Sequence, residues 1–197
     1  MNSIKKNEPN KYNDIQLAEI RYGLEGIYLT ITKVVIIFVV ALLLGIIKET
    51  IAVMLCYNVL RITGGGIHAT KSWICLVSSL LILIVGPLIA IHFQFPLLLK
   101  IFICCFCVIS FYLYAPADTV KHPIIKMKRR KLYKYLTVFT SLIYTFLCLY
   151  LKNNFLSNIF LISMIIETIL ILPLTYKIFK LPYNNYINYI LKNNPGI

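Results

Sequence analysis

Acidic residues are scarce in this sequence, and charged residues of either sign are few. Only 7 of the 197 residues are Asp or Glu, against 20 Lys and Arg, and charged residues make up 14% of the chain, where a soluble domain has roughly 25%. Hydrophobic residues reach 59%, and the mean hydropathy is +0.80. This composition excludes an ordinary soluble domain and predicts an integral membrane protein. The net charge of +13 then belongs to short segments that face anionic lipid, so we expect membrane lipid and no nucleic acid as a partner.

Metal-binding motifs are also scarce. The sequence contains no HExxH, and its CxxC spacing, from Cys104 to Cys107, lies inside an apolar run, so we expect neither a metal nor another cofactor. Five of the six cysteines lie within apolar stretches, where a thiol behaves as a small hydrophobic side chain. Cys75 is the exception, because it lies at the start of such a stretch.

Six apolar runs divide the chain. They cover 29–47, 50–60, 73–92, 96–115, 135–151 and 155–175. Five of them reach or nearly reach the ~20 residues that a helix needs to cross ~30 Å of hydrocarbon. The run 50–60 is too short, so it is either a short span or a re-entrant segment. We therefore predict an all-α, polytopic membrane helix bundle of about six membrane segments, one of them short or re-entrant.

The basic residues orient this bundle. Segment 116–134 carries seven Lys and Arg against one acid, Asp118, which places it in the cytoplasm by the positive-inside rule. Counting crossings in both directions places both termini in the cytoplasm. Residues 13–28 have apolar side chains at helical spacing and predict an N-terminal amphipathic surface helix; a stretch that merely leads into the first span is the equal alternative. We expect one membrane domain over 1–197, with a cytoplasmic segment 1–28, membrane segments 29–175 and a basic cytoplasmic tail 176–197.

One polar stretch, between the second and third apolar runs, carries candidate chemistry. It contains Arg61, three successive glycines at 64–66, His68 and Cys75. Glycines allow positive φ and a close approach of another chain, such as an extended peptide; a flexible turn is the equal alternative. If a helix begins near Ser72, Cys75 lies in its first turn, and His68 on the preceding turn can fold back to it. A thiol in the first turn of a helix lies near unpaired backbone N–H groups. With an imidazolium beside it, such a thiol ionises to a thiolate.

This arrangement suits a cysteine nucleophile with a histidine base. Judged by spacing alone, a core thiol and an imidazole that reaches water would be the better interpretation. The location favours chemistry, because the pair lies where an apolar span meets the cytoplasm in a chain otherwise nearly free of polar groups at membrane depth.

Two elements of the sequence resemble the AgrB family of quorum-sensing peptide processors. The first is Arg61…Gly65-Gly66-Ile67-His68-Ala69…Cys75, and the second is Tyr114-Ala115-Pro116…His122-Pro123-Ile124 with the basic run to Lys131. Length, hydropathy and the order of these elements agree over nearly the whole chain.

The resemblance implies a membrane cysteine endopeptidase in the bacterial cell membrane. Such proteins cut the C-terminal part from a small autoinducing-peptide precursor and help to close its signal segment into a thiolactone or lactone. By position, Cys75 would be the nucleophile and His68 its base, with the active site on the cytoplasmic side. The predicted substrate-binding or supporting residues are Arg61, Gly65, Gly66 and, from its depth in an apolar run, Glu167. For Arg61, a charge that only anchors the chain at the cytoplasmic side is the simpler alternative. The expected partners are a propeptide with an acidic C-terminal tail and, from size and family, a second copy in a homodimer.

Two other classes of protein remain open. A small peptide transporter or exporter without proteolysis would use ionisable groups in or near the apolar runs, namely Lys33, Lys100 and Glu167. Lys33 and Lys100 lie close to span ends, where their side chains can reach water, whereas Glu167 is deeper. The second alternative is an inactive membrane scaffold, in which the spacing of His68 and Cys75 is accidental.

Overall fold

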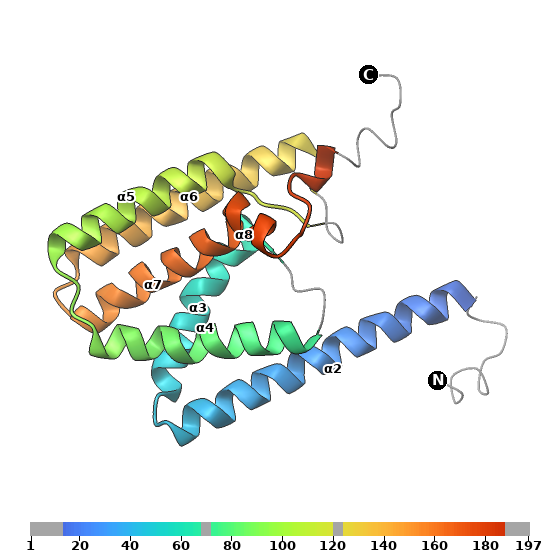
Figure 1. Ribbon diagram of the computed structural model, residues 1–197, viewed down its shortest axis with the longest axis horizontal. Coiled ribbons are helices and arrows are strands. Elements are labelled where there is room, and N and C mark those ends of the chain that lie inside the picture. The colour runs from blue at the N-terminus through green and yellow to red at the C-terminus, as the bar shows by residue number, and fades with distance from the viewer. Residues whose placement is uncertain (1–13, 68–71, 120–123, 188–197) are drawn as a thin grey trace.

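The chain folds into helices. The computed structural model describes residues 14–67, 72–119 and 124–187, and within these ranges the only sheet-like feature is a single parallel bridge between Gly65 and Ala117. The helices are α2 (Asp14–Leu43), α3 (Ile47–Gly64), α4 (Ser72–His92), α5 (Leu97–Tyr114), α6 (Met127–Tyr150), α7 (Asn154–Ile171) and α8 (Pro173–Ile178) (Figure 1). The predicted all-α fold is confirmed.

Within the described ranges, five helices are long and apolar enough to cross a membrane. These are α2 through its part Gly23–Leu43, α4 through Trp73–His92, and the whole of α5, α6 and α7. They indicate a multi-pass membrane protein. Helix α3 is not among the five; it has 18 residues but carries Lys48, Glu49 and Arg61. The six-segment topology, with α3 as the short or re-entrant sixth segment, therefore stays a prediction.

The N-terminal amphipathic segment and the first apolar run form one helix. Helix α2 runs without a break from Asp14 to Leu43, so the separate surface helix predicted for 13–28 is wrong as an element of its own. The physical reason is that this stretch contains Gly23 and Gly26 but no proline, and glycine weakens a helix without ending it. In Figure 1 the N-terminal half of α2 runs away from the other helices.

Helix α7 is the centre of the bundle, because it packs against α3, α4, α5 and α6. Several of its buried side chains are polar and bond to these neighbours. The Asn158 side chain donates to Ala90 O at 3.1 Å and to Phe93 O at 2.6 Å, at the end of α4. Lys100 of α5 is 6% exposed and donates to Ser157 Oγ at 2.6 Å. The expectation that Lys100 reaches water is therefore wrong, since its side chain faces α7.

Candidate active site

The glycine stretch ends α3 and is held to another part of the chain. Gly65 and Gly66 have positive φ values of 75° and 105°, which only glycine adopts at little cost. The Gly66 N–H donates to Ala117 O at 2.8 Å, and the Ala117 N–H donates to Gly64 O at 2.9 Å. The predicted positive φ is confirmed for two of the three glycines, while Gly64 is the last residue of α3. The close approach is to the chain's own residue 117.

No side chain would fit at these glycines. A Cβ at Gly65 would overlap Ala117 O, and a Cβ at Gly66 would overlap the Arg61 side chain and lie 2.8 Å from Leu170 O. A Cβ at Gly64 would lie 2.6 Å from the Glu167 carboxylate. Absence of side chains therefore lets the end of α3 approach both the loop after α5 and the end of α7.

Arg61 ties this backbone to α7. Its guanidinium donates to Gly65 O and, at 2.5 Å, to Ile67 O. It also forms an ion pair with Glu167, with 3.7 Å between Nη1 and Oε2. The Glu167 side chain is fully buried, and its oxygens accept no hydrogen bond from the described residues. Leu170 O accepts from the Ile67 N–H at 3.0 Å, so the chain is fixed up to residue 67.

The thiol of Cys75 lies in the first turn of α4, as predicted, because the helix begins at Ser72. Cys75 is half-buried, and Lys33 of α2 donates to its Sγ at 3.2 Å. Tyr57 of α3 is within electrostatic range of Cys75 and of the ion pair between Arg61 and Glu167. His68 lies outside the described residues, as does its predicted approach to Cys75.

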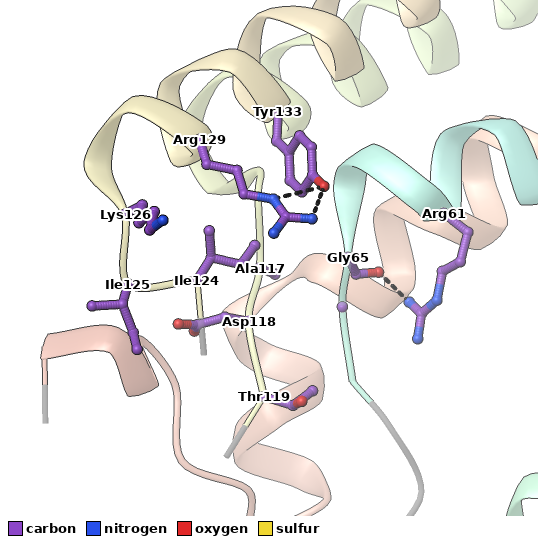
Figure 2. A pocket seen from close by; sticks show the side chains of 11 residues that line it. Arg61, Gly65, Ala117, Asp118, Thr119, Ile124, Ile125, Lys126, Arg129 and Tyr133 are labelled. Atoms are coloured by element: carbon purple, nitrogen blue, oxygen red, sulfur yellow. Dashed lines mark hydrogen bonds between the residues drawn. The ribbon is translucent and has the colours of Figure 1, made fainter. Parts of the chain in front are cut away.

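A basic cavity of about 570 Å³ opens beside the glycine stretch. Figure 2 shows Arg129 and Tyr133 of α6 on one side of it and the end of α3 on the other. Arg61, Lys126 and Arg129 supply positive charge, and the acid on the wall is Asp118. The described lining residues are Arg61, Gly65, Gly66, Ala117, Asp118, Thr119, Ile124, Ile125, Lys126, Arg129 and Tyr133.

Asp118 fastens the C-terminal segment to this region. Its carboxylate is 3% exposed and accepts the N–H groups of Asn185 at 3.1 Å and Tyr186 at 2.9 Å. Arg130 lies 3.6 Å from the carboxylate and stacks over the Tyr186 ring at 3.7 Å. Burial raises the pKa of the Tyr176 phenol, so it stays protonated and donates to Asp118 O at 3.0 Å. The negative charge of Asp118 is thus engaged within the chain, and no carboxylate of the described residues forms an ion pair with Lys126 or Arg129.

The comparisons with known proteins decide the family. The family model for Accessory gene regulator B, AgrB, matches residues 1–171. The chain belongs to the AgrB family. An AgrB-like protein of Clostridium acetobutylicum is 31% identical over 95% of this chain and 90% of its own. An AgrB-like protein of Listeria innocua is 32% identical over 87% of this chain and 84% of its own. Accessory gene regulator protein B of Staphylococcus aureus is 30% identical over 85% of this chain and 87% of its own. No solved structure matches the chain.

Within this AgrB-family fold, four of the six predicted site residues come together. They are Arg61, Gly65, Gly66 and Glu167. The roles of Lys33 and Asp118 were not predicted from the sequence. A signal existed for Asp118, because it is the only acid between Glu49 and Glu167. The segment that Asp118 holds, around Asn185, comes after residues 1–171, which the AgrB family model matches.

Proposed function

We propose that this AgrB-family protein is a membrane cysteine endopeptidase. Its substrate is a small autoinducing-peptide precursor, from which it cuts the C-terminal part and whose signal segment it helps to cyclise to a thiolactone or lactone. The observation that carries the proposal is the half-buried thiol of Cys75 in the first turn of α4. A helix N-terminus favours a thiolate, and family membership supports peptide processing as the reaction.

The proposed reaction has two steps that share one pair of residues. The Cys75 thiolate attacks a propeptide carbonyl and forms a thioester as the peptide C–N bond breaks, and protonated His68 gives its proton to the leaving amine. A nucleophile of the bound propeptide, such as its own thiol, then gives its proton to His68 and attacks the thioester. The ring forms and Cys75 departs as a thiolate. Because one acyl bond replaces another, the second step needs no ATP.

The glycine stretch supports this chemistry by positioning the backbone before His68. Arg61 holds the carbonyls of Gly65 and Ile67, and Leu170 O holds the Ile67 N–H. A catalytic base must be held within about 0.5 Å of its working position. We assign Arg61 and Glu167 to this positioning, since the guanidinium is already engaged by three groups of the chain.

The basic cavity suits the acidic C-terminal tail of the propeptide. Lys126 and Arg129 line it, and an arginine fork pairs a carboxylate in a bidentate manner. The cavity is also next to Gly65 and Gly66, so a tail bound there leaves the preceding peptide bond near the glycine stretch. The expected setting is the bacterial cell membrane, with both termini and this site on the cytoplasmic side.

Charge reversal tests the cavity. The double change Lys126→Glu with Arg129→Glu is expected to lower propeptide cleavage by roughly 10- to 100-fold, at about 1.4 kcal/mol per factor of ten, because it repels an acidic tail. Lys128→Glu is the matched control, since Lys128 is exposed on the same helix and lies outside the cavity. The measurement is the rate of shortening at subsaturating propeptide. An equal loss in the control would mean that lipid attraction, rather than the cavity, causes the effect.

The experiment that tests the function is capture of the acyl-enzyme. The purified chain in detergent is mixed with synthetic propeptide, quenched in acid, and digested for mass spectrometry. We expect Cys75 to carry the N-terminal part of the propeptide through a bond that neutral hydroxylamine releases. An exporter without proteolysis would leave Cys75 unmodified and the propeptide at full length.

A further inference from the structure

Lys33 is an ammonium group of the apolar part of α2, Gly23–Leu43, that the proposed mechanism has not used. Its side chain is half-buried. The expectation that Lys33 lies near a span end, where its side chain can reach water, stays a prediction. An ionisable side chain inside a membrane segment is costly and needs a partner.

The partner of Lys33 is the thiol of Cys75. Its Nζ lies 3.2 Å from Sγ, and within the described ranges no carboxylate forms an ion pair with it. An ammonium can only donate, and a thiolate accepts far better than a thiol. The contact therefore favours the ionised form of Cys75. It joins residues 42 positions apart on two helices that pack together, so it is part of the fold rather than a local pairing.

We infer that Lys33 is a further catalytic residue of the proposed peptidase, which holds Cys75 as a thiolate before attack and again when Cys75 leaves the thioester. This inference rests on the proposed function. At the moment of attack, Cys75 is a thiolate and His68 carries the proton. The imidazolium proton goes to the leaving amine in the first step, and the proton of the propeptide thiol returns to His68 in the second. Lys33 keeps its protons throughout.

The same contact bears on ring closure. In thiol exchange, a thiolate of lower basicity leaves faster. The ammonium of Lys33 makes Cys75 the better leaving group, so exchange favours the propeptide thioester over the acyl-enzyme. Loss of Lys33 is expected to lower the yield of ring per cleavage event as well as the cleavage rate. A purely structural role of Lys33 would lower the two together and leave their ratio unchanged.

The test is the alkylation rate of Cys75 by iodoacetamide in the full-length chain, resolved peptide by peptide with Cys56 as the reference thiol. Lys33→Met is expected to slow alkylation at pH 7 about tenfold, because it removes the ammonium that lies against Sγ. Lys33→Arg should stay within roughly threefold of wild type, because it keeps the charge. Lys48→Met is the matched control, since Lys48 is an exposed lysine in the first turn of α3. Equal rates in wild type and Lys33→Met, or an Arg variant as slow as the Met variant, would overturn the inference.

A second measurement decides the matter if Lys33→Met does not fold. Besides Lys33, the titratable groups to consider at Cys75 are Tyr57 of α3 and the proposed base His68. The His68→Ala chain keeps Lys33, so iodoacetamide should still alkylate Cys75 several-fold faster than Cys56 at pH 7. Equal alkylation rates for the two thiols would overturn the role of Lys33.

The failure of this inference is distinguishable from the failure of the proposed function. Cleavage that needs Cys75, with alkylation equal in wild type and Lys33→Met, keeps the peptidase and removes Lys33 from its mechanism. Cleavage that continues in Cys75→Ala refutes the peptidase mechanism and, with it, the catalytic role of Lys33.

Discussion

Cells that express Cys75→Ala together with the propeptide are expected to contain only full-length propeptide. Without the sulfur there is no atom to form the thioester, so cleavage should fall by roughly a thousand-fold or more. His68→Ala should also stop cleavage, with the thiol still present. Mass spectrometry of the propeptide measures both outcomes. The level of each variant in the membrane fraction is measured alongside.

Cys56→Ala is the matched control for this prediction. Cys56 is also a half-buried thiol, but it lies in the middle of α3 among apolar side chains. It should keep cleavage near the wild-type rate. Propeptide shortening that persists in Cys75→Ala would show that another protease acts and would favour the exporter. If alanine at Cys75 and at His68 leaves the propeptide unchanged from wild type, and the chain transports no peptide, the inactive scaffold would be favoured.

The helices were predictable because their signal is local. Apolar runs located α4, α5 and α7 to within a few residues. Helix α6 begins at Met127, eight residues before the predicted run, because its first turns are rich in Lys and Arg and show no apolar signal. The same charges that predict a cytoplasmic loop thus also form the start of a helix, and hydropathy alone does not separate a basic loop from a basic first turn.

The site was only partly predictable, since its parts meet through long-range contacts. The glycine stretch and Cys75 stand out in the sequence, and Gly65 and Gly66 do adopt positive φ. The partners of Asp118 and Cys75 are far away along the chain, at Asn185 and Lys33. A single sequence does not report such pairs. Glu167 was noticed for its depth, and the fold gives it a specific partner in Arg61.

The ion pair between Arg61 and Glu167 predicts a large effect of Glu167→Ala. The change leaves the Arg61 guanidinium, whose side chain is 22% exposed, without its carboxylate. Removing one member of a buried ion pair costs roughly 3–5 kcal/mol, and a chain of this size loses about 2–4 °C of thermal midpoint per kcal/mol. We expect a midpoint lower by roughly 10 °C in detergent and cleavage lower by about 100-fold, because Arg61 also positions the backbone before His68.

Two further variants separate stability from positioning. Arg61→Met combined with Glu167→Met removes both charges, so it should recover most of the lost stability. It should not recover cleavage, because the carbonyls of Gly65 and Ile67 then lack the donor that Arg61 provides. Glu49→Ala, in the first turn of α3, is the control for loss of one acid. A double variant that regains both stability and cleavage would assign the ion pair to folding alone, whereas recovery of stability without cleavage would establish Arg61 as the residue that holds the glycine stretch in its working conformation.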